Sequence, residues 1–120
     1  MRPSMQLGQD GEDLAAAHLT AAGMEVLARN WRCREGELDI VAREPSGAIV
    51  FVEVKARSGT RFGEPAEAVG RVKARRIHVL ACRWLAENRP SDSPALRFDV
   101  VSVVRRRGFA PEIQHLRGAF

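Results

Sequence analysis

The chain has 120 residues, of which 45% are hydrophobic and 28% charged, and its formal net charge is +4. This length suits one ordinary domain and leaves no room for a separate reader domain, and the composition excludes a disordered chain. No apolar run approaches the ~20 residues of a membrane span and the N-terminus lacks the features of a secretory signal, so we expect a single domain over residues 1–120, in the cytoplasm and without a membrane partner.

The basic excess is mostly arginine, whose planar guanidinium suits phosphate oxygens, and an acidic partner is therefore expected. A compositional bias of the source would give the same excess, so charge alone does not separate the two explanations. Cys33 and Cys82 lie far apart and, like the scattered histidines, lack the spacing of zinc ligands. Any metal bound here is expected to be held by oxygen.

The first half of the chain predicts one helix followed by strands. Residues 8–22 are rich in alanine, which predicts a helix, and residues 24–30 have the character of a short strand before a basic connection. Residues 36–44 alternate with period two, which predicts a strand with Asp39 on one face and Leu38 on the other.

The second half predicts a hairpin, a long helix and further strands. A turn at residues 44–47 leads into the strongest strand of the chain, residues 48–56. Pro65 suits the first turn of a long amphipathic helix that extends to residue 89. One or two strands are expected after it, at residues 96–104 and 112–118. The order αβββαβ(β) predicts an α/β fold, a three-layer sandwich in which helices flank a mixed central sheet.

The hairpin is predicted to bring two acids together. A turn centred on Ser46 pairs Asp39 with Glu53, and Glu37 with Lys55. Opposed carboxylates destabilise a sheet and raise the proton affinity of one of them. A bulge that shifted the register by one residue would instead place the two acids on opposite faces.

A divalent cation would compensate this repulsion. Mg²⁺ and Mn²⁺ prefer oxygen ligands, which Asp39, Glu53 and the backbone carbonyl of Val54 would supply. Lys55 lies on the same strand face as Glu53 and would orient a water molecule or stabilise developing charge during phosphodiester cleavage. The competing interpretation is a salt-bridged surface strand, because an E-x-K triplet alone is a weak signal.

Three more charged residues bear on this choice. Glu12 follows Gly11 on the first helix and would add a carboxylate to the metal, although an exposed acid at a helix start explains it as well. Lys73 shares a helical stripe with apolar residues, which suits either phosphate contact or a snorkelling side chain. Glu37 would either join the metal ligands or pair with Lys55.

Arginines supply the candidate phosphate contacts. Most of the arginines in the chain are expected to be solvated surface residues, and no zinc finger or RNP motif indicates base-specific recognition. Together with Lys73, the candidates for nucleic-acid binding are Arg34, Arg57, Arg61 and Arg76.

Several motifs occur in the order and spacing of a known family. The chain resembles the YraN-like family of small bacterial endonuclease-like proteins, within the PD-(D/E)XK nuclease superfamily, in GEDLAAAHLTAAG, NWRCREGELDIVA, VFVEVKARSGTRFGEP, RFDVV and the terminal AF. This resemblance implies a restriction-endonuclease-like fold related to Holliday-junction resolvases, with Mg²⁺ or Mn²⁺ as cofactor. By position it implies catalytic roles for Asp39, Glu53 and Lys55 and a metal ligand at Glu12, whereas Leu38 stands where the superfamily often has proline.

The leading hypothesis is therefore a metal-dependent endonuclease that hydrolyses DNA, including branched or structured DNA. The alternatives are a non-catalytic nucleic-acid-binding module of the same fold and an RNA-processing nuclease. A pure binder needs no converging acids, which argues against the first alternative. A homodimer would let two centres address two strands, although the sequence shows no interface.

Overall fold

The computed structural model describes residues 4–58, 69–90 and 92–120. Within these ranges, no helix is both long and apolar enough to cross a membrane. In chain order the elements are α1 (Ser4–Ala21), β1 (Glu25–Cys33), β2 (Gly36–Arg43), β3 (Ile49–Ser58), α2 (Arg71–Asn88), β4 (Leu96–Arg105) and β5 (Glu112–Leu116).

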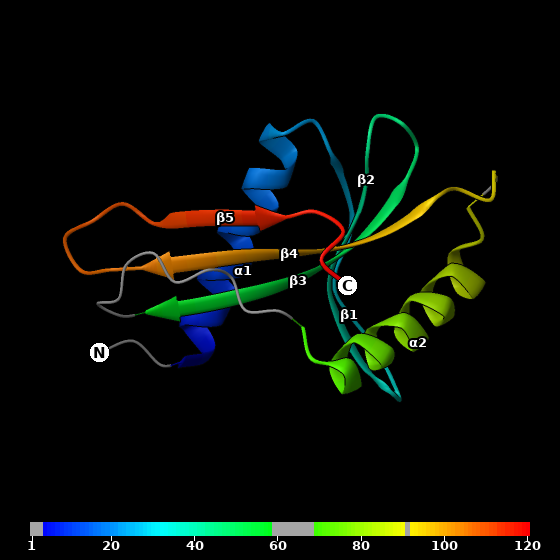
Figure 1. Ribbon diagram of the computed structural model, residues 1–120, viewed down its shortest axis with the longest axis horizontal. Coiled ribbons are helices and arrows are strands. Elements are labelled where there is room, and N and C mark those ends of the chain that lie inside the picture. Colours follow the sequence, from blue (N-terminus) through cyan, green and yellow to red (C-terminus); the bar gives the residue numbers. More distant parts are fainter. Residues whose placement is uncertain (1–3, 59–68, 91) are drawn as a thin grey trace.

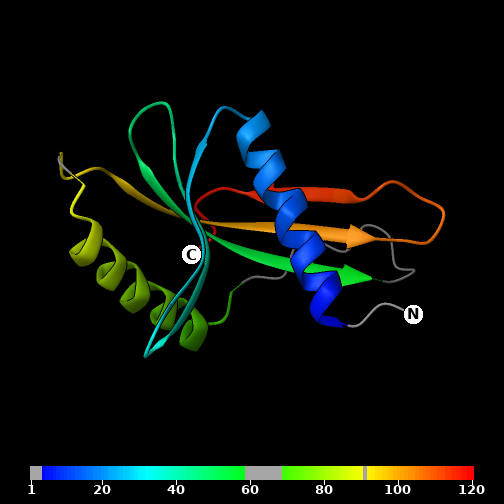
Figure 2. The same ribbon diagram turned by 180° about the vertical axis from the view of Figure 1, so that it is seen from behind.

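The strands form one mixed sheet in the order β1-β2-β3-β4-β5. β3 and β4 are parallel and joined through α2, whereas the other neighbours are antiparallel. Figures 1 and 2 show α1 and α2 on opposite faces of this sheet. The α/β three-layer sandwich predicted from the sequence is confirmed, with two strands after α2.

Two apolar cores lie on the two faces of the sheet. Because neighbouring residues of a strand point to opposite faces, β3 contributes Val50 and Val52 to the core beneath α1, and Ile49 and Phe51 to the core beneath α2. All four side chains are at most 3% exposed. β3 is thus a central strand that is buried on both faces. Its acid Glu53 directly follows this run of four apolar residues.

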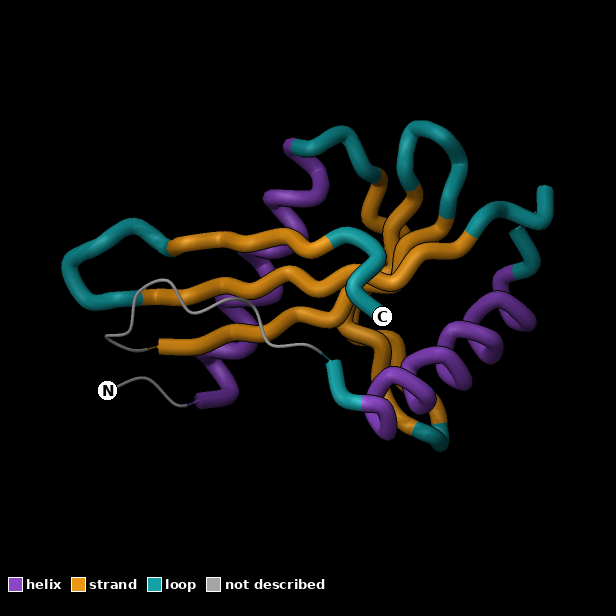
Figure 3. The backbone as a smooth tube through the Cα atoms, viewed as in Figure 1, coloured by secondary structure: helices purple, strands orange, loops and turns teal. Residues whose placement is uncertain are grey.

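The predicted hairpin register is confirmed over the paired part of β2 and β3. The pairs run from Arg43 with Ile49 to Ile40 with Val52, and the ladder ends there. Beyond this point β2 continues along β1, and Figure 3 shows β1 and β2 running steeply across the other strands. Leu38 packs beneath α2 although Ile40 packs beneath α1, so the strict alternation predicted for β2 breaks between them.

Two predicted boundaries need correction. The long helix does not extend through Val69 and Gly70, because Gly70 has extended backbone angles (φ −66°, ψ 160°) and caps a helix that begins at Arg71. The predicted start at Pro65 lies outside the described residues. The basic connection predicted after residue 30 is strand as far as Cys33, because it pairs with β2.

A buried ion network anchors the C-terminal end of the chain. The carboxylate of Asp99 on β4 is 0% exposed and accepts hydrogen bonds from Arg97 Nε (2.8 Å), the ring of His115 (2.8 Å) and the backbone N–H of Gly118 (2.9 Å). Arg97 also reaches Glu44 in the β2–β3 turn (2.7 Å). The network therefore ties together the turn, β4, β5 and the terminal residues.

Close packing of α1 on β3 depends on Gly11. A Cβ atom at this position would lie 2.5 Å from the Cβ of Ala56. We expect Gly11→Ala to lower the free energy of unfolding by about 1–2 kcal/mol, because overpacking outweighs the better helix propensity of alanine. Urea denaturation would measure this difference.

The matched control is Gly70→Ala, because no atom lies within 4 Å of a Cβ placed there and its φ is ordinary. Replacing a glycine by alanine at such a helix cap should lower the free energy of unfolding by less than about 1 kcal/mol. A Gly11→Ala variant as stable as the wild type would show that α1 is not seated by this contact.

Candidate active site

Three acids from three elements approach one another where β2 leaves β3. We call Glu12 of α1, Asp39 of β2 and Glu53 of β3 the carboxylate cluster. Asp39 and Glu53 are within hydrogen-bonding reach of each other, and the charge of Glu12 acts on Asp39. Asp39 and Glu53 lie just beyond the last pair of the β2–β3 ladder, Ile40 with Val52.

Asp39 is the most perturbed acid of the cluster. Burial, together with the charge of Glu53 and a hydrogen bond to it, raises the pKa of Asp39 to about 7. The N–H of Val54 donates to Asp39 Oδ2 at 2.9 Å and opposes that rise. Near neutral pH, Asp39 is therefore poised to release its proton to solvent when a cation binds.

Glu12 is buried beside the sheet and contacts a base. Its Oε1 accepts a hydrogen bond from Arg29 Nε of β1 at 3.2 Å. Burial raises the pKa of Glu12, Arg29 opposes this rise, and the charge of Glu37 adds to it. The alternative interpretation of Glu12 as an exposed acid at a helix start is thus wrong, because Glu12 is only 8% exposed.

Glu53 is paired with the helix on the other face. Lys73 of α2 forms a short salt bridge to Glu53 through Nζ. The Lys73 side chain remains 54% exposed, so its stem reaches inward while much of it stays in water. This contact places Lys73 at the carboxylate cluster, from the side opposite Glu12.

Lys55 and Val54 follow Glu53 along β3. Lys55 is half-buried, two residues beyond Glu53, and its backbone pairs with Ser102 of β4. Val54 contributes its N–H to the cluster. A ligand role for the Val54 carbonyl stays a prediction.

Glu37 contacts an arginine on the neighbouring strand β1, which is neither of its two predicted partners. Glu37 lies opposite Arg32 in the β1–β2 ladder and accepts a hydrogen bond from Arg32 Nε at 2.5 Å. The predicted cross-strand pairs of Glu37 with Lys55 and of Asp39 with Glu53 are not part of the β2–β3 ladder, because β2 has turned away from β3 by then.

The candidate phosphate-binding arginines are spread over the molecule. Arg34 lies in the exposed β1–β2 turn, Arg57 is half-buried near the end of β3, and Arg76 is exposed on α2 one turn beyond Lys73. Arg61 falls outside the described residues. The candidate Lys73, by contrast, contacts the carboxylate cluster through Glu53.

The oxygen donors of the cluster suit a hard divalent cation but do not yet enclose one. Among the described residues, no group of three or more His, Cys, Asp or Glu side chains is arranged to hold a metal ion. The reason is visible in the contacts, since Glu12 faces Arg29 and Glu53 faces Lys73. Asp39 and Glu53 fit a cation best, because it would relieve the repulsion that raises the pKa of Asp39.

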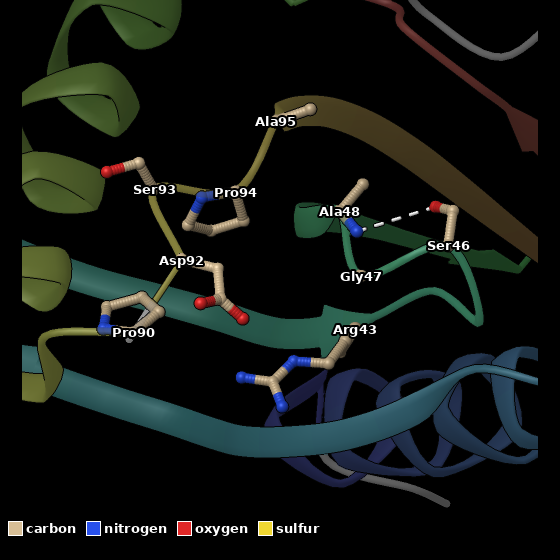
Figure 4. Close-up of a pocket in the computed structure, with 9 residues that line it drawn as sticks. All are labelled: Arg43, Ser46, Gly47, Ala48, Pro90, Asp92, Ser93, Pro94 and Ala95. Carbon is tan, nitrogen blue, oxygen red and sulfur yellow. Dashed lines mark hydrogen bonds between the residues drawn. The ribbon is translucent and has the colours of Figure 1, made fainter.

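A separate pocket lies beyond the other end of β2. Figure 4 shows it between the β2–β3 turn and the segment before β4, lined by residues that include Arg43, Asp92 and Ala95. Asp92 is the sole acid among the described residues that line it. Without a second carboxylate the pocket lacks the paired acids of the cluster, and we do not assign the chemistry to it.

Fold and site together define an α/β protein in which two helices and a mixed sheet gather a cluster of carboxylates and bases. The chain belongs to the uncharacterised protein family UPF0102, whose profile matches residues 11–103. It is 55% identical to UPF0102 proteins of Parafrankia sp. (strain EAN1pec) and Frankia casuarinae over 120 residues, the full length of each chain. A UPF0102 protein of Nocardia farcinica is 54% identical over 116 residues, which cover 95% of this chain and 88% of the relative.

Arg29 is the member of this site that the sequence did not indicate. It lies in a strand whose pattern predicts only alternation, and nothing local distinguishes it from the other arginines of the chain. Its partner Glu12 is 17 residues away, so only the packing of α1 against β1 reveals the contact. The Asp99 network was missed for a similar reason.

Proposed function

We propose that this protein is a metal-dependent endonuclease that hydrolyses phosphodiester bonds, with DNA, including branched DNA, as the favoured substrate over RNA. The observation that carries the proposal is the pair of half-buried Asp39 and buried Glu53, with a pKa of Asp39 raised to about 7 and Lys55 two residues further along β3. Paired, perturbed acids at one point are typical of catalytic sites. The net charge of +4 is consistent with a polyanionic substrate.

The residues have distinct roles in this proposal. Asp39 and Glu53 would hold Mg²⁺ or Mn²⁺, with Glu12 as a further carboxylate. When bound, the cation supplies a Lewis acid that neutralises phosphate charge and lowers the pKa of the attacking water. Lys55 orients that water and stabilises the charge that develops on the phosphate, while Lys73 contacts a phosphate oxygen from α2.

A second candidate function is a nucleic-acid-binding module that does not cleave. The salt bridges from Arg29 to Glu12 and from Lys73 to Glu53 favour it, because they satisfy the acids without a metal. Such a module would bind nucleic acid with an affinity that falls steeply as salt rises, and divalent cations would produce no cleavage.

Cleavage assays with defined substrates test the proposal. The full chain would be incubated with linear duplex DNA, single-stranded DNA, four-way-junction DNA and RNA, each with Mn²⁺, with Mg²⁺ and with EDTA. We expect cleavage that requires a divalent cation and is fastest on a DNA substrate. Faster cleavage of RNA would identify an RNA-processing nuclease, and salt-dependent binding without cleavage would support the binding module.

A further inference from the structure

Two bases from different elements neutralise the carboxylate cluster in the folded chain. Arg29 of β1 contacts Glu12 at 3.2 Å through Nε and Asp13 at 2.5 Å through Nη2. Lys73 of α2 contacts Glu53. These bases take up oxygen atoms that a divalent cation would need as ligands.

The acids are buried, whereas the bases reach solvent. The side chains of Glu12 and Glu53 are each 10% exposed, whereas those of Arg29 and Lys73 are 35% and 54% exposed. A buried carboxylate needs a positive partner, but a long basic side chain that reaches solvent leaves at small cost when another cation takes its place. The two salt bridges are therefore exchangeable without unfolding the site.

The charges also match such an exchange. One divalent cation carries the same charge as Arg29 and Lys73 together. If both bases stayed in place, the incoming cation would meet two positive groups and fewer available oxygen atoms. Once displaced, both bases would remain beside the site, where a guanidinium and an ammonium bind phosphate oxygens.

We propose that Arg29 and Lys73 are internal counter-cations that a divalent metal displaces and that then bind the phosphate groups of the substrate. The inference rests on the proposed function and adds Arg29 to it as a phosphate-binding residue. Metal and nucleic acid then bind cooperatively, because each favours the state in which the bases have left the acids. By linkage, the factor by which the metal tightens nucleic-acid binding equals the factor by which nucleic acid tightens metal binding.

Calorimetric titration with Mn²⁺, without nucleic acid, tests the first half of the exchange. We expect Arg29→Gln and Lys73→Gln each to bind Mn²⁺ about 5-fold or more tightly than the wild type, because an internal competitor is gone. Arg29→Lys keeps the charge and should return the affinity toward the wild-type value. Melting temperatures in EDTA establish that each variant is folded.

Matched controls separate this effect from a change of net charge. Arg32→Gln removes a charge from β1, where Arg32 pairs with Glu37, and Arg76→Gln removes one from α2 one turn beyond Lys73. Neither substitution removes the salt-bridge partner of Glu12 or of Glu53, so Mn²⁺ affinity should change by less than about 2-fold. If a control variant gained as much Mn²⁺ affinity as Arg29→Gln and Lys73→Gln, the proposed exchange would be overturned.

A labelled 20-base-pair DNA duplex tests the second half. Fluorescence anisotropy would measure the affinity of this duplex for the wild type and for Arg29→Gln, with Ca²⁺ and with EDTA. We expect Ca²⁺ to strengthen binding less in Arg29→Gln than in the wild type. An equal gain in both proteins would remove Arg29 from the phosphate site. If Mn²⁺ affinity is unchanged in every variant while the protein still shows metal-dependent cleavage, the exchange alone is refuted. If Mn²⁺ does not bind with or without DNA, the proposed function is refuted as well.

Discussion

Asp39→Asn is expected to reduce metal-dependent cleavage by at least about 100-fold while leaving the chain folded. Asparagine keeps an oxygen that accepts the N–H of Val54, so the local backbone contact is preserved. It removes the negative charge that would bind the cation beside Glu53. Single-turnover cleavage of the best DNA substrate at saturating Mn²⁺ would measure the loss.

The control for this substitution is Asp92→Asn, which alters an exposed acid in the separate pocket. Its cleavage rate should stay within about 2-fold of the wild type, as surface substitutions away from special features usually change little. A fully active Asp39→Asn variant would mean that the cluster is not the catalytic centre, even if the protein itself cleaves DNA.

Asp39→Asn should also stabilise the metal-free chain above neutral pH. Because burial and the charge of Glu53 raise the pKa of Asp39 from 3.8 to about 7, the folded chain holds a proton that the unfolded chain loses between these values. Wild-type stability therefore falls as pH rises from about 4 to 7, and the penalty is complete above 7. Urea denaturation in EDTA should show Asp39→Asn more stable by about 1–2 kcal/mol at pH 8, with a smaller gain at pH 5.

Asp99→Ala is expected to cost about 3–5 kcal/mol of the free energy of unfolding, a large part of the stability of a chain this size. The substitution leaves Arg97, the ring of His115 and the N–H of Gly118 without their shared acceptor. Urea denaturation at pH 7 would measure the loss, and Asp99→Asn, which keeps one carbonyl oxygen as an acceptor, should lose less.

Glu35→Ala is the matched control, because Glu35 also pairs with an arginine, Arg83 at 3.1 Å, but both of these side chains are exposed, by 37% and 49%. Its cost should stay below about 1 kcal/mol. Although burial opposes it, hydrogen bonds from His115 and Arg97 hold the pKa of Asp99 well below its usual value of 3.8. The stabilisation that the Asp99 carboxylate provides is therefore complete above about pH 4 and is lost only in stronger acid. Equal costs for Asp99→Ala and Glu35→Ala at pH 7 would contradict a structural role for this network.

Local patterns were sufficient for the fold class and part of the hairpin. The alternation in β2 and β3 and the turn between them determine the register from Ile40–Val52 to Arg43–Ile49, since a one-residue slip would expose a buried face. The beginning of α2 was misjudged because helical periodicity continues across Gly70, whose backbone is extended.

The site was only partly accessible from sequence. Asp39, Glu53 and Lys55 stand out because charged residues interrupt strands with apolar neighbours. The pairing of Glu37 with Arg32 and the end of the ladder at Ile40 were not accessible, because they depend on the twist by which β2 leaves β3.

For this protein, the sequence by itself determined the elements, the hairpin register and the acids of β2 and β3, because these follow from residue periodicity and turn chemistry. Tertiary structure alone decided which bases face those acids. Arg29 meets Glu12, and Lys73 meets Glu53, across packed elements that are distant in the chain. Such contacts depend on how helices lie on a twisted sheet, and no short-range pattern encodes that arrangement.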